Sequence, residues 1–366
     1  MARFVVVGLG RIGLRVLWML DRLGHEAFGI GSTLDSVEKA RRLGLEAYTG
    51  DLFSSHKLLR KHGDPDVVVV ALPGAIGYRA LEFLIKEGYN IVDVSFFPED
   101  PLGLVEEIEK NNNTVVVDAG IAPGLSNFLV GRGVKLYDSK RAIIYVGGIS
   151  RKPNPPLGLA PAWSMEDLLD EYLRPARLIR NRKLVSVDPL ESETGTITVS
   201  HIGTLEYFPT DGLRTLLFTF PDMDEMVEYT LRWPGHLDFI KKLKSIGFLS
   251  DFNLNVNGCP VRPRSCLARL LEHELKGIED LVVLVVEVGN RENGVRYEVI
   301  VEPKDEWSAM SIATSAFQVA SAVLLSEDRL PKGLVFPEHI ALNDENARYV
   351  MRFIEQWGVA VTEQSL

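Results

Sequence analysis

The first 120 residues alternate short apolar runs with stretches of helical period. The runs are rich in Val and Ile, as buried strands are, and most are followed by Gly, Pro, Ser or Asp. After the first run, apolar residues recur at helical spacing at Leu14, Leu17 and Leu20. Strands that alternate with helices in this way predict an α/β fold with a parallel, doubly wound sheet. The predicted strands are 4–7, 27–30, 47–48, 66–72, 91–94 and 114–117.

The pattern changes after Pro123-Gly124, where strand-like segments begin to dominate. Turn residues separate several of them, and Asn293-Gly294 is typical of the tip of a hairpin. This region therefore predicts an α+β domain with a largely antiparallel sheet, suited to substrate binding and dimerisation. The predicted strands are 142–147, 184–187, 196–201, 204–208, 215–219, 225–232, 281–288 and 296–301.

Three helices are predicted beyond the first region. One covers 164–173, where Ser164 and Asp167 form a capping pair, and a second covers 237–246. The third, 310–325, consists almost wholly of small and apolar residues, so it has to be buried against a large surface. We expect this third helix to return the chain to the first domain.

A chain of 366 residues is long enough for two domains with separate cores. The change of pattern places a Rossmann domain at 1–122, which residues 308–366 would complete. The α+β domain then covers 123–307.

Composition and charge narrow the class of protein. With 46% hydrophobic and 25% charged residues, the composition is that of a soluble globular protein. The net charge of −10 argues against non-specific binding to nucleic acid or to anionic membranes. Cys259 and Cys266 have no second pair beside them, so we expect neither a metal site nor a disulfide framework, and the cytoplasm is the expected compartment. The longest apolar runs fall short of the roughly 20 residues of a membrane span.

The segment Gly8-Leu9-Gly10-Arg11-Ile12-Gly13 directly follows the first predicted strand and opens the first predicted helix. Gly8 would make the tight turn, Gly10 would let the backbone approach a pyrophosphate, and Gly13 would let helix and strand pack closely. The N-terminus of the helix offers N–H groups and a partial positive charge to the phosphates. The sequence therefore predicts a dinucleotide site that includes Arg11 and Ile12.

The end of the second strand bears on the choice between NAD and NADP. An acid at this place binds the ribose 2′-hydroxyl of NAD, but the chain has Ser32 and Thr33 instead. Lys39, Arg41 and Arg42 follow on the next helix and could meet a 2′-phosphate, so the sequence favours NADP. The alternative is that these cations form a solvated helix face and that Ser32 binds NAD.

Ligands of an open parallel sheet lie beyond the carboxyl ends of its strands. Leu72, Pro73 and Gly74 follow the fourth strand, and we expect them to contact the cofactor. Asp51 follows the third strand and could touch the adenine, or it could cap the helix that comes next.

Five segments carry a family resemblance: 92–96, 118–127, 171–176, 211–214 and 230–236. Together they resemble the saccharopine dehydrogenase-like family, and within it the L-lysine 6-dehydrogenases most closely. The resemblance implies a homodimeric or homotetrameric enzyme with a Rossmann domain and a substrate domain. Because such lysine dehydrogenases often favour NAD, the missing acid at Ser32 is a departure from their pattern.

Substrates of that family are amino acids, so their carboxylate has to be bound. Arginine binds carboxylates bidentately, and Arg174, Arg214 and Arg232 each lie in one of the five segments. For each arginine the alternative is a structural ion pair. Tyr172 could hydrogen-bond the substrate or pack in the core, and Ser95 is a further candidate for substrate binding.

Oxidation of a carbon that bears nitrogen needs a neutral amine, whereas an alkylammonium has a pKa near about 10.4. A general base is therefore expected, and Asp93, Asp118 and His236 are the candidates. The two aspartates could instead cap turns or helices. His236 begins a predicted helix, so its pKa should be depressed and the ring neutral, although a lone histidine is often structural.

These inferences predict an NAD- or NADP-dependent amino-acid dehydrogenase. The favoured reaction is oxidation of L-lysine at its ε-carbon, followed by closure to Δ1-piperideine-6-carboxylate. The alternatives are a saccharopine reductase or a carboxynorspermidine-type dehydrogenase, and, from another class, a dinucleotide-binding protein without catalysis.

Overall fold

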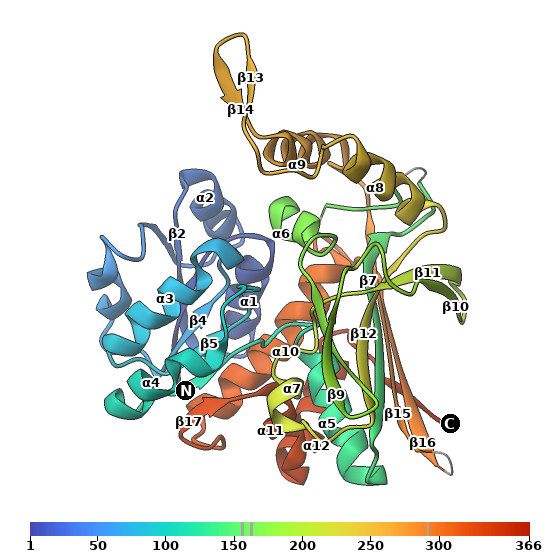
Figure 1. Ribbon diagram of the computed structural model, residues 1–366. Coiled ribbons are helices and arrows are strands. Elements are labelled where there is room, and N and C mark those ends of the chain that lie inside the picture. The colour runs from blue at the N-terminus through green and yellow to red at the C-terminus, as the bar shows by residue number, and fades with distance from the viewer. Residues whose placement is uncertain (155–156, 162–163, 291–292) are drawn as a thin grey trace. The chain divides into compact units, whose positions relative to one another are not determined.

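The computed structural model describes residues 1–154, 157–161, 164–290 and 293–366 (Figure 1). The chain forms two compact units. Unit 1 contains residues 1–132 and 311–360, and unit 2 contains residues 133–310 and 361–366. The predicted boundary after residue 122 lies before helix α5 (Leu125–Tyr137), whereas the division falls within this helix.

Unit 1 is built on a seven-stranded sheet in the order β17-β6-β5-β4-β1-β2-β3. All its strand pairs are parallel, and helices connect most of its strands, which confirms the doubly wound α/β fold. The strands are β1 (Arg3–Val7), β2 (Glu26–Gly31), β3 (Ala47–Thr49), β4 (Val67–Val70), β5 (Ile91–Asp93), β6 (Thr114–Val116) and β17 (Gly333–Val335). The helices are α1 (Arg11–Arg22), α2 (Leu34–Arg42), η1 (His56–Arg60), α3 (Gly74–Lys86), η2 (Pro101–Leu104), α4 (Val105–Asn111), α11 (Pro337–Leu342) and α12 (Asp344–Gln356).

The centre of this sheet is buried on both faces. All four valines of β4 are fully buried, which explains why its sequence is apolar without alternation. Helix α10 (Ala309–Ser326) is long and apolar enough to span a membrane, but 94% of it is buried inside the fold. Its side chain Gln318 donates a hydrogen bond of 2.8 Å to the carbonyl of Val70, so α10 packs beside the end of β4.

Unit 2 contains a nine-stranded mixed sheet. Its path is β10-β11-β12-β7-β15-β16-β18, β8 pairs with β12, and β9 pairs with β8. Only the pair β12–β7 is parallel among the pairs of the described strands in this sheet. The strands are β7 (Arg141–Ser150), β8 (Ala176–Arg180), β9 (Lys183–Val187), β10 (Gly195–Val199), β11 (Gly203–Pro209), β12 (Glu225–Arg232), β15 (Asp280–Gly289), β16 (Gly294–Val301) and β18 (Thr362–Ser365). The helices are α6 (Met165–Asp170), α7 (Leu216–Thr219), α8 (His236–Ser245) and α9 (Pro263–Glu274), and a separate hairpin consists of β13 (Leu254–Val256) and β14 (Cys259–Val261).

One predicted strand of unit 2 is wrong. Residues 215–219 form the short helix α7 and its first turn, in which Phe218 and Thr219 both donate backbone hydrogen bonds to the carbonyl of Thr215. Leu216 and Leu217 are buried there. A short apolar run fits a buried helical turn as well as a strand, so its pattern alone could not separate the two.

Candidate active site

The glycine loop of unit 1 contains glycines of two kinds. Gly8 has φ +96°, and a Cβ there would lie 2.3 Å from the carbonyl oxygen of Ala71. A Cβ on Gly13 would lie 1.8 Å from the carbonyl oxygen of Gly8. By contrast, a Cβ on Gly10 would meet no protein atom within 4 Å. The packing of the protein therefore requires Gly8 and Gly13, whereas the space beside Gly10 is open at the N-terminus of α1, where a pyrophosphate would bind.

The loop after β4 lies against the glycine loop. The carbonyl oxygen of Ala71 lies so close to Gly8 that only a glycine fits there. The N–H of Ala71 donates a hydrogen bond of 2.9 Å to the carbonyl of Val7. Gly74 begins α3, and a Cβ there would lie 2.3 Å from the carbonyl oxygen of Phe96. The structure thus places Ala71 and Leu72 against the glycine loop and Gly74 against Phe96, and contact of 72–74 with the cofactor remains a prediction.

The residues that follow β2 and β3 have local structural roles. Thr33 caps α2, because its hydroxyl oxygen accepts a hydrogen bond of 3.3 Å from the N–H of Ser36. Ser32 is exposed. Asp51 accepts hydrogen bonds from the N–H groups of Phe53 and Ser54, and these bonds lower the pKa of its carboxyl. Asp51 therefore caps a turn, and its contact with adenine remains a prediction.

The three cations proposed for a 2′-phosphate interact locally. Arg41 donates a hydrogen bond of 2.8 Å to the carbonyl of Ala47. Lys39 and Arg42 each pair with an acid one turn earlier on α2, at 2.6 and 3.5 Å. Exposed pairs of this kind contribute little stability, so a ligand could still compete for Lys39 and Arg42.

Asp93 and Asp118 follow neighbouring strands. Asp93 accepts hydrogen bonds from the hydroxyl and the N–H of Ser95, at 2.7 and 3.0 Å, and both residues are buried. Asp118 is buried with φ +54°, an uncommon conformation for a residue other than glycine. The N–H of Ala119 donates to the carbonyl of Asp93 at 2.8 Å, which ties the two strand ends together. Strained residues of this kind cluster at functional sites.

In unit 2, three of the predicted residues form one buried hydrogen-bonded chain. Arg232 Nε donates to the hydroxyl of Tyr172 at 3.0 Å, and this hydroxyl lies 2.8 Å from His236 Nε2. The other ring nitrogen of His236 contacts the carbonyl of Leu157, which can only accept, so Nδ1 carries the proton. His236 Nε2 therefore accepts the hydrogen bond that the hydroxyl of Tyr172 donates. Burial, together with the charge of Arg232, lowers the pKa of His236 to about 3, so the ring is neutral, as the sequence predicts, but chiefly because it is buried.

Every guanidinium nitrogen of Arg232 donates within the protein. In addition to Tyr172, Nη1 donates to the carbonyl of Leu231 at 2.9 Å, and Nη2 pairs with Glu171 at 2.6 Å. Its side chain is only 2% exposed. This geometry agrees with a structural ion pair, and substrate binding by Arg232 remains a prediction.

Arg174 and Arg214 form a charged cluster with Arg232, Glu171 and Asp211, since the charges of these groups act on one another. Burial lowers the pKa of Arg174, the charge of Asp211 raises it, and the charge of Arg214 lowers it. Arg214 is buried and has φ +49°, whereas Arg174 is half-buried. Asp211 forms a bidentate pair with Arg177, at 2.8 and 2.9 Å. The structure thus brings all the predicted residues of unit 2 into one cluster.

Sequence reasoning missed Glu228, which lies in this cluster on β12. Its carboxyl accepts a hydrogen bond of 2.8 Å from Thr210. Burial, with the nearby charges of Glu171 and Asp211, raises the pKa of Glu228 to about 8. A Cβ on Gly212 would lie 1.3 Å from a carboxyl oxygen of Glu228, so this glycine leaves room for the acid. The signal in the sequence was an acidic residue in the middle of a predicted strand, between Val227 and Tyr229.

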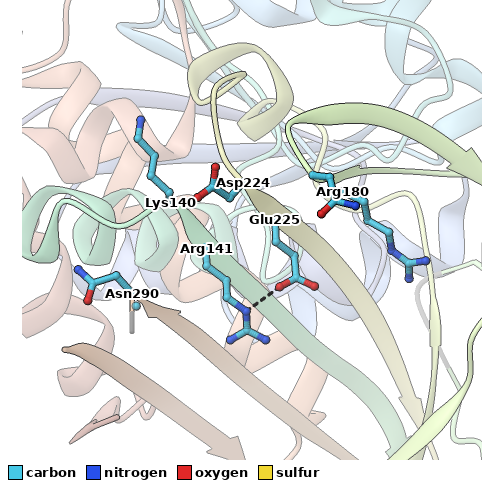
Figure 2. Close-up of a pocket in the computed structure, with 8 residues that line it drawn as sticks. Lys140, Arg141, Arg180, Asp224, Glu225 and Asn290 are labelled. Carbon is cyan, nitrogen blue, oxygen red and sulfur yellow. Dashed lines mark hydrogen bonds and ion pairs between the residues drawn. The ribbon is translucent and has the colours of Figure 1, made fainter. Parts of the chain in front are cut away.

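A cavity of about 620 Å³ in unit 2 contains none of these residues (Figure 2). It lies at the start of β12, among Lys140, Arg141, Arg180, Asn181, Asp224, Glu225, Gly289 and Asn290. Arg141 and Glu225, which are neighbours on β7 and β12, form an ion pair of 2.6 Å in its lining. Since Arg232 ends the same strand and a strand rises about 3.3 Å per residue, the cavity is roughly 20 Å from Arg232.

Comparison with known proteins bears on the whole arrangement. Residues 120–359 match the model of the saccharopine dehydrogenase C-terminal domain. The chain is 23% identical over 260 residues to saccharopine dehydrogenase [NADP(+), L-glutamate-forming] of Saccharomyces cerevisiae. This match covers 67% of this chain and 58% of that protein. It is 21% identical over 229 residues to the enzyme of the same name from Schizosaccharomyces pombe, covering 60% of this chain and 50% of that protein. The chain thus spans about half the length of the curated relatives it matches.

A solved structure shows the same fold. Apo saccharopine dehydrogenase (L-Glu forming) from Saccharomyces cerevisiae superposes with a TM-score of 0.81 at 17% identity, and the match covers 100% of both chains. The match of 120–359 to the domain model covers more than half of the sequence. The chain therefore belongs to the saccharopine dehydrogenase-like family.

Proposed function

We propose that the protein is a nicotinamide-dinucleotide-dependent oxidoreductase that acts on the CH–NH bond of an amino acid. The observation that carries the proposal is the open space beside Gly10 at the start of α1, in a chain of this family. Protein packing does not explain this glycine, whereas the approach of a pyrophosphate does. The printed names of the curated relatives, which are NADP(+)-dependent saccharopine dehydrogenases, support the same class of reaction.

The residues of unit 1 fit a dinucleotide. The N-terminus of α1 would hold the pyrophosphate, and the loop 72–74 would flank it. When bound, the nicotinamide would accept or donate the hydride. We infer a preference for NADP, because Ser32 stands where NAD-binding chains have an acid and because the relatives are named for NADP(+).

L-lysine is the first candidate substrate, on the family resemblance of the five segments. Its oxidation at the ε-carbon would give a semialdehyde that closes to Δ1-piperideine-6-carboxylate. Saccharopine is the second candidate, which the names of the relatives favour. In either case we assign the substrate carboxylate to Arg174, because it is half-buried while Arg214 and Arg232 are almost fully buried.

Removal of a proton from the substrate amine falls to a carboxylate in this proposal. His236 is buried, and its Nε2 already accepts a hydrogen bond from the hydroxyl of Tyr172, so we assign it to positioning Tyr172. Both oxygens of Asp93 accept hydrogen bonds from Ser95. Asp118 is our first candidate for the base, because it is buried at the next strand end and held in an uncommon backbone conformation.

The test is a substrate panel followed by the absorbance of the reduced cofactor. Lysine, saccharopine, ornithine and polyamines are each offered with NAD and with NADP. We expect turnover with lysine or saccharopine and faster turnover with NADP. A protein that binds neither dinucleotide in calorimetry would overturn the proposal, and one that binds a dinucleotide but oxidises no substrate of the panel would be a binding protein without this catalysis.

A further inference from the structure

Unit 1 contains an arginine whose guanidinium lies over an aromatic ring, outside the glycine loop. The guanidinium carbon of Arg79, on α3, lies 4.4 Å from the ring centre of Phe53. The ring of Phe83 meets Phe53 edge to face at 5.6 Å and supports it from within. Arg79 is exposed, and its charge acts on Asp51. The guanidinium of an exposed arginine is thus held over a half-buried aromatic ring.

The pair stands at the carboxyl edge of the sheet. Phe53 belongs to the loop after β3, and the carboxylate of Asp51 fixes that loop by accepting the N–H of Phe53 at 3.2 Å. Arg79 lies in the second turn of α3, which begins at Gly74 on the same edge. Side chains of a helix lean toward its N-terminus, so the long side chain of Arg79 extends back toward this edge.

The adenosine half of a dinucleotide binds on this side of the sheet. In the strand order β4-β1-β2-β3, a pyrophosphate would bind at the start of α1, and the adenosine ribose would meet the end of β2. The loop after β3 lies one strand further on, where the base itself would be placed. Arginine binds flat rings through its planar, delocalised face, and an aromatic ring behind it holds that face in position.

We propose that Arg79, supported by Phe53, forms the stacking platform for the adenine of the cofactor. This inference rests on the proposed function. The ligand class is an adenine nucleotide with or without a 2′-phosphate, because a stacked base is bound through its face and not through the ribose.

Calorimetry with ADP-ribose and 2′-phospho-ADP-ribose tests the platform without turnover. We expect Arg79→Ala to weaken the binding of both ligands about tenfold, or about 1.4 kcal/mol. Arg79→Lys should lose most of the same affinity, because lysine keeps the charge but lacks the plane. Phe53→Leu should weaken both ligands less, since it removes only the support.

Arg22→Ala is the matched control. Arg22 is also exposed and lies over an aromatic ring, Trp18, at 5.7 Å, but it ends α1 at the opposite edge of the sheet. This control should bind both ligands as the unmodified protein does. The platform is overturned if Arg79→Ala binds ADP-ribose normally, or if only the 2′-phosphorylated ligand is weakened, which would make Arg79 a phosphate ligand. If the unmodified protein binds neither ligand, the proposed function fails together with the platform.

Discussion

The glycine loop of unit 1 is shaped by backbone atoms, whereas the charged cluster of unit 2 is shaped by side chains. In the loop, backbone atoms define the shape: a protein oxygen occupies the space beside Gly13, and open space lies beside Gly10. In the cluster, side chains define the shape, and Arg232 has its charge balanced by Glu171 at 2.6 Å. A backbone site fails when atoms are added, whereas a side-chain cluster fails when one partner is removed. The two regions should therefore respond to opposite kinds of substitution.

Gly10→Val should produce the largest effect on cofactor binding. The φ of −75° at Gly10 is accessible to valine, and no protein atom would clash with its Cβ, so the fold should persist. The added atoms would occupy the space of the pyrophosphate, and we expect the affinity for both dinucleotides to fall at least about 100-fold. Calorimetry measures the affinity, and thermal unfolding checks the fold.

Gly13→Ala is the comparison for that variant. Its Cβ would overlap the carbonyl oxygen of Gly8, so it should lower the stability by about 1–3 kcal/mol or more. Normal cofactor binding by Gly10→Val would show that the dinucleotide site is elsewhere.

Asp118→Asn should lower kcat by about 10²- to 10⁴-fold without weakening cofactor binding, if Asp118 is the base. His236→Gln should lower kcat less, because His236 acts through Tyr172.

The oxidative rate of the unmodified protein should rise with pH, since the substrate amine has a pKa of about 10.4. A flat profile between about pH 6 and 10, or a normal kcat for Asp118→Asn, would move proton transfer to other residues.

Separating the partners of the cluster should be costly to stability. Glu171→Leu and Arg232→Met each leave a buried charge without its partner, and each should destabilise the fold by about 3–5 kcal/mol. The double variant should lose less than the sum of the two, which urea unfolding can measure. Because we assign the substrate carboxylate to Arg174, KM should stay near normal in the double variant. A fall in kcat/KM of roughly 30- to 1000-fold at normal stability would return that role to Arg232.

Glu228 gives an effect of another kind, a slope of stability with pH. Its pKa is raised to about 8 in the fold, above the ordinary value of 4.5, so the folded state holds a proton that the unfolded state has lost. Its contribution to stability is therefore complete at low pH and is lost as the pH rises to about 8. Glu228→Gln should flatten this loss, which urea unfolding at about pH 5, 7 and 9 can detect. Equal slopes for both proteins would mean that Glu228 ionises in the usual range.

The features that could be predicted from the sequence are local ones. The run 4–7, the glycines and the amphipathic stretch after them lie within 20 residues, and the structure contains β1, the tight turn and α1 there. The parallel sheet also followed from local strand patterns, because each buried strand is a continuous apolar run. The short family motifs led to the family that the comparisons show.

The features that could not be predicted depend on partners distant in the chain. Arg232 and Glu171 are 61 residues apart, so no spacing indicated that the guanidinium has a carboxylate within the protein. Strand 225–232 was predicted with its bounds, but the burial of Glu228 depends on the neighbouring strands and on Gly212. The sequence predicts a strand where the helix at 216–219 lies, because a short run of buried apolar side chains has the same pattern in both elements.

The sheet of unit 1 can be completed only late in the synthesis of the chain. Its edge strand β17 pairs with β6, although 333–335 leave the ribosome long after 114–116. Residues 133–310 of unit 2 emerge between them, and α10, which covers the end of β4, follows only then. Throughout that interval the first 132 residues would expose the apolar surface that α10 later buries, which invites aggregation or the binding of a chaperone. A fragment that ends at residue 132 should therefore be insoluble, and expression of the dinucleotide unit by itself would require residues 311–360 to be joined to it.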